Sequence, residues 1–242
     1  KYSEIDVVAV SNQSYSNLYQ KFIHSFDFSK LNLIKKLKSK FFNKSSVKDE
    51  IKNLCRDNGE NLNNLKFKIY NVEHHLTHIA SAYYLSNFTE TTAAFSYDGS
   101  GDAVSIMLAE CNKNKIKVLE KVYLPKSLGH FYSAVCNYIG FEKFGEEYKV
   151  MGLSAYGEDK YSEYLEKLIG YDEKSILRQK DIFNYNSIDY KKKNIIKFND
   201  NIFPNKSVEK FSKESKNIAK SLQVTFEKIV MNIITRLQKK IP

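Results

Sequence analysis

The sequence contains little cysteine and no long apolar run, and both absences narrow the kinds of protein it can be. Its three cysteines, Cys55, Cys111 and Cys136, are odd in number and lie far apart without any C-x-x-C pair. This spacing excludes a disulfide framework and a zinc ribbon, so we expect ordinary buried or half-buried thiols. No stretch approaches the roughly 18 apolar residues of a membrane helix, and no signal-peptide pattern opens the chain. We therefore expect a cytoplasmic protein with no membrane contact.

The composition is that of a globular chain with a basic surface. Of its 242 residues, 42% are hydrophobic and 14% aromatic, which is enough to build a core. The formal net charge of +10 is compatible with a partner such as a nucleotide or nucleic acid. However, the lysines are spread over every segment. The densest stretches, at residues 35–40 on an expected amphipathic helix and at residues 191–193 in an expected loop, do not alternate with aromatics as in single-strand binders. We interpret the charge as solvated surface, so a nucleic-acid partner is not expected.

The first half of the chain alternates between strand and helix patterns. The apolar run at residues 5–10 predicts a short buried strand of the parallel type. Residues 15–58 predict basic helical segments, residues 65–70 a strand, and residues 73–85 a helix. Three further strand patterns follow at residues 93–97, 104–108 and 116–122, which predicts an antiparallel meander with a glycine-rich first corner.

Helical patterns dominate the second half. Residues 127–139 predict a helix with Ser127 as its N-cap, residues 161–169 a short helix, and residues 215–239 a long helix with one buried face. Residues 145–157 have no period and predict an irregular segment, and residues 171–205 predict an insertion or surface excursion. Strands and helices in this order indicate an α/β protein.

The histidines are clustered. Three of the five in the chain lie within five positions, at His74, His75 and His78. On a helix, His74 and His78 face the same way, close enough to share one ion, and imidazole suits iron, zinc, copper or nickel. His75 and His78 are a competing pair. The zincin motif needs a glutamate after its first histidine, and His75 stands there, so the pattern is not that of a metalloprotease. The alternative is helical histidines that only pack, but the clustering favours a metal site.

A glycine-rich acidic corner follows one of the predicted strands, with the sequence Asp98-Gly99-Ser100-Gly101-Asp102. Glycines let the backbone approach a phosphate closely, and Asp98 can supply the carboxylate of an N,N,O metal site. The alternative is an ordinary hairpin corner. Its position one strand after the histidine helix favours the metal site.

Residues 145–157 combine three glycines and two acids around Lys149. This predicts a loop that lines a ligand, in which Lys149 clamps a phosphate or a carboxylate. The alternative is a tight connection between two helices with ordinary surface charge.

Four motifs in this order carry a family resemblance. They are His74-His75-Leu76-Thr77-His78-Ile79-Ala80-Ser81-Ala82-Tyr83-Tyr84, the Asp98 corner, Ser127-Leu128-Gly129-His130-Phe131-Tyr132-Ser133, and Glu147-Tyr148-Lys149-Val150-Met151-Gly152-Leu153. Together they resemble the carbamoyltransferases that include the nodulation-factor and the aminoglycoside or cephem O-carbamoyltransferases. The resemblance is strongest over residues 66–157 and weaker over residues 5–10 and 218–223.

The resemblance implies the two-lobed nucleotide-binding fold of actin, hexokinase and the heat-shock chaperones (the ASKHA fold). Residues 1–92 would then be the remainder of the first lobe with the metal-binding helix, and residues 93–242 the second lobe. It also implies an enzyme that makes a carbamoyl-adenylate from ATP and carbamoyl phosphate. The carbamoyl group is then transferred to the hydroxyl of a small acceptor, such as a sugar or an aminoglycoside-like molecule.

Site residues follow from the resemblance position by position. A metal, iron in family members, is expected on His74, His78 and Asp98. The residues expected to bind the nucleotide or the carbamoyl group are Gly99, Ser100, Gly101, Glu147, Lys149 and Gly152. No catalytic residue is identified by the motifs.

The departures from the family pattern predict a fragment. A glycine-rich hairpin with a G-H-D motif is expected before Lys1. A glycine-glycine motif, a last aspartate ligand and a second, C-terminal domain are expected after Pro242. The chain is therefore expected to be truncated at both ends and inactive alone. Two rival interpretations are a tRNA threonylcarbamoyl-transfer relative, which the motif around Lys149 disfavours, and a basic module that binds nucleic acid or a membrane surface, with structural histidines.

Overall fold

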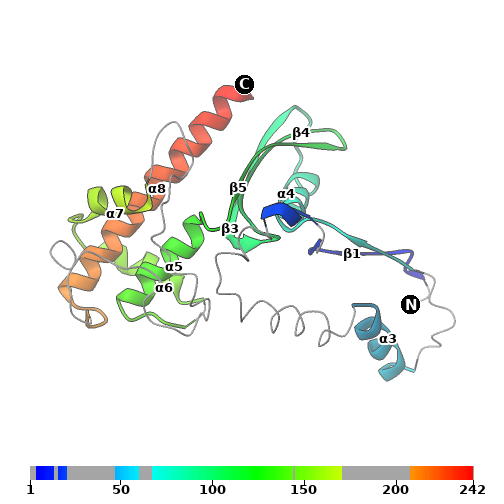
Figure 1. Ribbon diagram of the computed structural model, residues 1–242, viewed down its shortest axis with the longest axis horizontal. Helices are drawn as coiled ribbons and strands as arrows, with labels where there is room; N and C mark the ends of the chain where they lie inside the picture. The colour runs from blue at the N-terminus through cyan, green and yellow to red at the C-terminus, as the bar shows by residue number, and fades with distance from the viewer. Residues whose placement is uncertain are drawn as a thin grey trace.

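The computed structural model describes residues 4–13, 16–20, 47–59, 67–143, 145–170 and 208–241. These residues form a mixed α/β structure with one two-stranded and one three-stranded sheet (Figure 1). The expectations for residues 35–40, 171–205 and 191–193 lie outside the described residues. Within the described residues, no helix is both long enough and apolar enough to span a membrane.

The centre of the structure is an antiparallel sheet of three strands in the order β3-β4-β5, with β3 at Thr92–Gly101, β4 at Val104–Asn112 and β5 at Lys115–Tyr123. This confirms the predicted meander. The β3–β4 turn consists of Asp102 and Ala103, both with a positive φ (52° and 67°), as a tight two-residue hairpin turn requires. A register shift between Tyr97 and Gly101 interrupts the pairing of β3 just before this turn.

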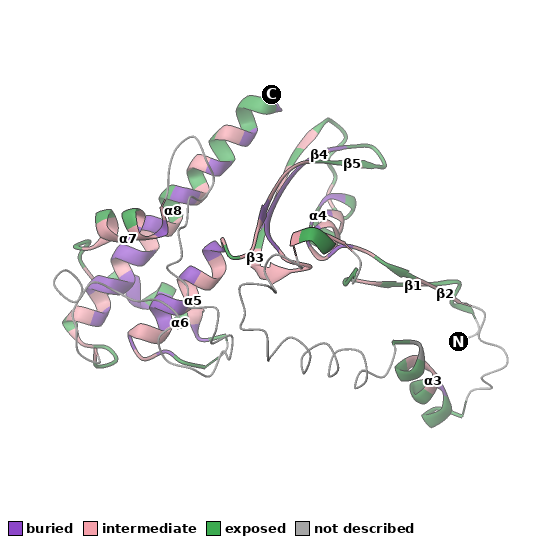
Figure 2. Cartoon of the chain, in the orientation of Figure 1, coloured by how far each residue is buried: buried purple, intermediate pink, exposed green. Residues whose placement is uncertain are grey.

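The central strand β4 is buried on both faces, which makes the structure three-layered (Figure 2). Ile106 and Leu108 pack into the larger apolar cluster, which the C-terminal helices share. Met107 and Ala109, on the other face, pack with Ile79 in a smaller cluster. Ile79 lies on helix α4 at His74–Tyr84, which covers that face of the sheet.

The second helical layer contains α5 at Leu128–Tyr138, α6 at Glu147–Leu153, the 3-10 helix η3 at Ser154–Tyr156, α7 at Ser162–Ile169 and α8 at Lys213–Lys240. The Ser127 side chain accepts a hydrogen bond from the N–H of His130, which confirms its prediction as the N-cap of α5. The helical spacing of apolar residues in α8 is also confirmed, since Ile218, Leu222 and Ile229 are completely buried.

The prediction of an irregular segment at residues 145–157 is wrong, because α6 and η3 occupy most of it. Val150 and Leu153, three residues apart, are the buried side of α6 and join the larger core. Two inward positions in a helix of seven residues are too few to establish a period in the sequence. Gly152 lies inside α6, where a single glycine costs only about 1 kcal/mol relative to alanine and does not prevent the helix.

The N-terminal described residues form the two-stranded sheet and helix α3 at Val47–Asp57. Strand β1 at Val7–Val10 pairs in parallel with β2 at Lys68–Asn71, which confirms the predicted orientation. The prediction that this strand is buried is wrong, since Ile5 is 38% and Val7 53% exposed. Within the described residues β1 pairs only with β2, and a two-stranded ribbon cannot cover both of its own faces. All three cysteines are buried and unpaired with one another, as expected.

Candidate metal centre

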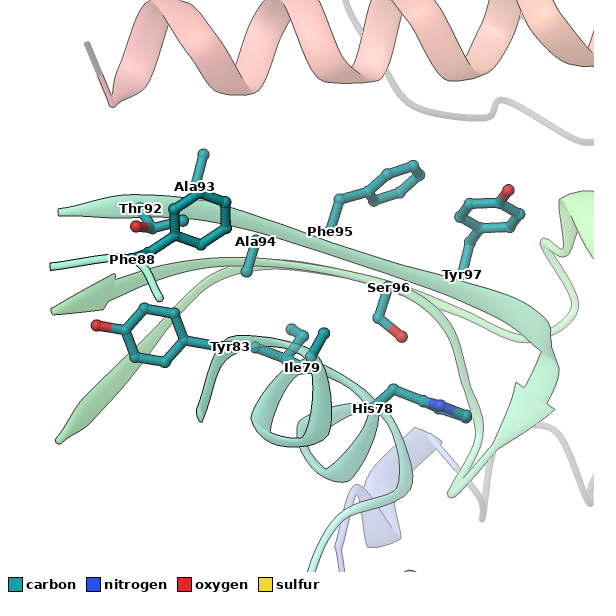
Figure 3. A pocket seen from close by; sticks show the side chains of 11 residues that line it. His78, Ile79, Tyr83, Phe88, Thr92, Ala93, Ala94, Phe95, Ser96 and Tyr97 are labelled. Carbon is teal, nitrogen blue, oxygen red and sulfur yellow. The ribbon is translucent and has the colours of Figure 1, made fainter. Parts of the chain in front are cut away.

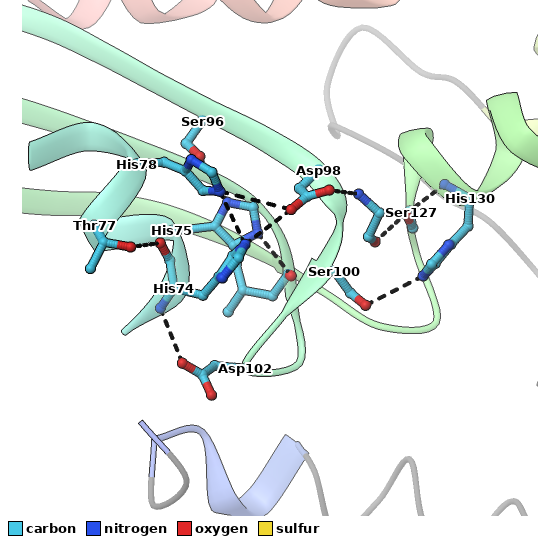
Figure 4. Close-up of polar contacts among 12 residues, drawn as sticks. His74, His75, Thr77, His78, Ser96, Asp98, Ser100, Asp102, Ser127 and His130 are labelled. Atoms are coloured by element: carbon cyan, nitrogen blue, oxygen red, sulfur yellow. Dashed lines mark hydrogen bonds and ion pairs between the residues drawn. The ribbon is translucent and has the colours of Figure 1, made fainter. Parts of the chain in front are cut away.

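Two imidazoles from α4 and one carboxylate from β3 meet at one point (Figure 4). The Nε2 atoms of His74 and His78 are 3.0 Å apart. Asp98 Oδ2 lies 3.0 Å from His74 Nε2 and 3.8 Å from His78 Nε2. The two histidines are one helical turn apart, and Asp98 is near the end of β3, the strand on which α4 packs.

The separations among these three atoms suit a shared cation. Two ligand atoms bound at about 2.1 Å to one ion lie about 3.0 Å apart at a right angle and about 3.4 Å apart at a tetrahedral angle. The observed distances of 3.0, 3.0 and 3.8 Å are close to this range. Two imidazole nitrogens and a carboxylate oxygen are also the donor set that iron and zinc accept. The residues present therefore fit a transition-metal ion.

The electrostatics of Asp98 favour its charged form. Partial burial by itself would raise the pKa of this carboxyl, but hydrogen bonds from the His74 ring and from the Gly99 N–H outweigh it, and the pKa lies below its ordinary value. The side chains of His78 and Asp98 remain 53% and 44% exposed, so an ion and a ligand can reach them.

The third clustered histidine has a structural role. His75 is completely buried, with Nε2 2.9 Å from the carbonyl oxygen of Val104 and Nδ1 2.9 Å from the hydroxyl of Ser96. A carbonyl only accepts, so the neutral ring carries its proton on Nε2 and accepts from Ser96 at Nδ1. Burial lowers the pKa of His75, which keeps the ring neutral. Both of its nitrogens are engaged, so the structure does not bring His75 and His78 together as a ligand pair.

The glycine-rich corner is packed between α4 and the start of α5. A side chain at Gly101 would collide with the His74 ring, and one at Gly129 would lie 2.7 Å from the backbone of Asp98 and Gly99. The Ser127 hydroxyl donates to the carbonyl of Gly99 at 2.6 Å. Gly101 and Gly129 thus allow close packing of β3 against α4 and α5, which the local sequence alone did not indicate.

A fourth histidine, His130, lies on the α5 side of the same corner. Its Nε2 is 3.3 Å from the hydroxyl of Ser100 (Figure 4). Ser96, Asp98 and Ser100, alternate residues of β3, therefore each contact a histidine. His130 was not singled out from the sequence, because it is separated from the other histidines by the whole meander.

A cavity of about 380 Å³ opens beside His78, between α4 and β3 (Figure 3). Its lining is mostly apolar, with Ile79 and Tyr83 from the helix and Ala94 from the strand. Figure 3 shows the His78 ring at one end, so the candidate metal centre borders this cavity.

The other predicted ligand residues lie elsewhere, on α6. Lys149 Nζ is 2.9 Å from Glu146 Oε1, and this ion pair raises the pKa of Lys149. Glu147 accepts a hydrogen bond from the Ser133 hydroxyl of α5 at 2.7 Å. Gly152 faces open space. Helix α6 lies beside α5 and well away from α4 in Figure 1, so the structure does not join these residues directly to Asp98.

Comparison with known proteins defines the class. The family model of the carbamoyltransferase N-terminus matches residues 3–241, nearly the whole chain. The chain belongs to this family.

Among curated proteins, the chain is 30% identical over 168 residues to the nodulation protein NolNO of Sinorhizobium fredii, covering 67% of this chain and 22% of NolNO. It is 40% identical over 93 residues to the nodulation protein NolO of Bradyrhizobium diazoefficiens, covering 38% of this chain and 17% of NolO. An uncharacterized Synechocystis protein is 35% identical over 167 residues, covering 66% of this chain and 26% of that protein. The chain thus spans about a quarter or less of the length of these relatives.

Proposed function

We propose that this chain is the metal- and nucleotide-binding part of a carbamoyltransferase with the two-lobed ASKHA fold. Residues 1–92 would contribute to the first lobe and residues 93–242 to the second. In the proposed reaction, ATP, carbamoyl phosphate and water yield a carbamoyl-adenylate, pyrophosphate and inorganic phosphate. The carbamoyl group is then transferred to the hydroxyl of a sugar or an aminoglycoside-like acceptor, and AMP leaves. Membership of the family supports the transferase class.

The observation that carries the proposal is the convergence of His74, His78 and Asp98 beside a glycine-rich turn. These three side chains would hold a divalent ion, with iron as the first choice. When bound, such an ion supplies positive charge that orders nucleotide phosphates and polarises a carbonyl group. Asp98 supplies the negative charge that favours a cation at this point, and its pKa lies below its ordinary value.

The turn after Asp98 is suited to hold a phosphate near these ligands. The Ser127 hydroxyl ties the carbonyl of Gly99 to the start of α5, which restrains the corner. Gly99, Ser100 and Gly101 would then present backbone and hydroxyl groups to the nucleotide or to the carbamoyl group. Because the corner is ordered before binding, its donors need not lose further conformational freedom when a phosphate binds.

We assign Glu147, Lys149 and Gly152 to another part of the same ligand. Lys149 would exchange its ion pair with Glu146 for a phosphate. The Lys149 side chain is 43% exposed and could turn to a phosphate, while the 11% exposed Glu146 side chain would keep the hydrogen bond from the Lys143 N–H.

The relatives are much longer than the part that this chain matches, so we propose the complete reaction only for the whole protein. We assign formation of the carbamoyl-adenylate to a further, C-terminal domain of the same polypeptide. The present chain alone would bind metal and nucleotide without completing the transfer.

The first test is metal content after dialysis. Wild-type protein should retain the metal, and both His74→Ala and His78→Ala should lose most of it. Ser81→Ala is the matched control, because Ser81 is an exposed residue on the same helix and donates only to the carbonyl of His78. Equal metal content in all four proteins would exclude this centre. Salt-sensitive RNA binding that is unchanged in the histidine variants would instead support a nucleic-acid-binding module.

The second test uses the whole protein with ATP, carbamoyl phosphate and a panel of hydroxyl acceptors. With an acceptor present, we expect ATP and carbamoyl phosphate to be converted to AMP, pyrophosphate and inorganic phosphate, with AMP release depending on the acceptor. A folded, metal-loaded whole protein that consumes neither ATP nor carbamoyl phosphate would exclude the reaction.

A further inference from the structure

The start of helix α4, which carries His74, is held by a side chain from another element. Asp102 Oδ2 accepts a hydrogen bond of 3.0 Å from the backbone N–H of His74, the first residue of the helix. The first N–H groups of a helix have no partner inside it and need one from outside. Glu73, at the N-cap position, makes no capping bond with its own side chain. Asp102 therefore caps the N-terminus of α4 from the β3–β4 turn.

The side chain of Glu73 is engaged elsewhere, and this engagement extends the network. Glu73 is nearly buried and accepts hydrogen bonds from Lys121 Nζ at 2.8 and 3.0 Å and from Asn17 Nδ2 at 3.0 Å. Asn17 also donates to the carbonyl of Asp102 at 3.1 Å. The same Asp102 oxygen that binds His74 accepts the N–H of Gln13 at 2.9 Å. Gln13 and Asn17, which follow β1 in the chain, are thus tied to the turn and to the start of the helix.

We propose that Asp102 is a positioning residue for the metal centre and couples that centre to Gln13 and Asn17. This inference rests on the proposed metal site. Asp98 lies near the end of β3, and Asp102 is the first residue of the β3–β4 turn that follows. Asp98 supplies one metal ligand, and Asp102 fixes the helix that supplies the two histidine ligands. The separation between the carboxylate and the imidazoles therefore depends on the Asp102 bond.

A metal ion requires its ligands to be placed accurately, so the loss of one positioning hydrogen bond should measurably lower metal affinity. Metal–ligand distances tolerate only about 0.2 Å of change. Residues that orient ligands without touching the ion typically change metal affinity about 10- to 100-fold when they are replaced. We expect a loss within this range when Asp102 no longer binds His74.

The backbone at Asp102 allows a clean choice of variants. Its φ of 52° lies in the left-handed region, where glycine and asparagine are tolerated. Asp102→Gly deletes the acceptor without straining the turn. Asp102→Asn keeps an acceptor oxygen and the shape of the side chain. If only the turn conformation matters, both variants should bind metal like the wild type.

The matched control is Asp159→Gly. Asp159 Oδ1 accepts the N–H of Ser162, the first residue of α7, at 3.1 Å, so it supports a helix start in the same way but far from the metal centre. This variant loses that bond and also the one that the Ser162 hydroxyl donates to Oδ2 at 2.7 Å, and it should keep its metal affinity.

The experiment is a Co²⁺ titration of the purified protein, followed by the visible absorption of the bound ion. Asp102→Gly should raise the Co²⁺ dissociation constant about 10- to 100-fold. Asp102→Asn should stay within about threefold of wild type, and Asp159→Gly should match it. Affinity in Asp102→Gly equal to wild type would overturn the inference, as would equal losses in Asp102→Gly and Asp159→Gly. Wild-type protein that binds no Co²⁺ at all would instead refute the metal site itself.

Amide hydrogen exchange provides a second readout of the coupling. If a hydrogen bond raises metal affinity tenfold, thermodynamic linkage requires that bound metal raise the equilibrium constant for forming that bond about tenfold. Adding Co²⁺ should therefore slow exchange at the His74 amide about tenfold in the wild type. Exchange at the Gln13 amide, which binds the same Asp102 oxygen, should also slow, and neither effect should occur in Asp102→Gly. Co²⁺-independent exchange at Gln13 in a wild-type protein that binds Co²⁺ would show that the segment is not coupled to the centre.

Discussion

Gly101 provides the sharpest test of the geometry of the centre, because its replacement disturbs a ligand without removing it. A Cβ atom at this position would lie 2.0 Å from His74 Cδ2, 2.1 Å from Cγ and 2.5 Å from Cβ. Carbon atoms in contact prefer separations of about 3.5 Å or more, so Gly101→Ala must open the gap between β3 and α4 by about 1.5 Å. The contact includes His74 Cβ, so a rotation of the ring alone cannot relieve it.

Two consequences follow for Gly101→Ala. Overpacking of this kind typically costs about 1–3 kcal/mol of folding stability. In addition, a shift of about 1.5 Å is many times the 0.2 Å that metal–ligand distances tolerate, so His74 is lost as a ligand. We expect Co²⁺ affinity to fall at least about 100-fold, the upper end of the effect of supporting residues.

The assay pairs urea denaturation with the Co²⁺ titration, and Gly152→Ala is the control. Gly152 lies inside α6, and a Cβ atom added there would meet no atom of a neighbouring element within 4 Å, so alanine should stabilise the protein by about 0.5–1 kcal/mol. It should leave Co²⁺ affinity unchanged. If Gly101→Ala keeps both the stability and the Co²⁺ affinity of the wild type, the close packing of His74 on the corner is wrong.

Three further predictions concern other parts of the structure. Burial would raise the pKa of Asp159, but hydrogen bonds from Ser162 and other groups outweigh it, and the pKa lies below its ordinary value of 3.8. The resulting stabilisation is present above pH 3.8 and is lost as the pH falls through the folded-state pKa. Asp159→Asn should therefore destabilise the protein at pH 7 but not in strong acid, as acid and neutral urea titrations will measure. Burial raises the pKa of Cys136 far above its ordinary value, so native protein should resist iodoacetamide at this residue until it is unfolded, as mass spectrometry will measure. Lys121→Met leaves the carboxylate of Glu73 buried with less compensation and should cost about 1–3 kcal/mol in urea denaturation, part of which Glu73→Gln in the same chain should restore.

Local patterns in the sequence were enough to predict the elements that carry the candidate site. The spacing of His74 and His78 placed both on one side of a helix, and helix α4 has that form. The apolar run before Asp98 predicted a strand, and the corner after it leads into the first turn of the confirmed meander. These are short-range consequences of helical and strand periodicity, which any chain with these residues shares.

The sequence alone determined, then, that three histidines and an aspartate lie near the ends of neighbouring elements. It left open whether His74 or His75 faces Asp98, because a helix can rotate about its axis without any change in its own hydrogen bonds. Tertiary packing decided this. Ile79 and Tyr83 bury one side of α4 against the sheet, which turns His75 inward to Ser96 and leaves His74 and His78 at the carboxylate. The capping of α4 by Asp102 depends on the same packing, because it joins residues 28 positions apart that meet only when the helix lies on the sheet.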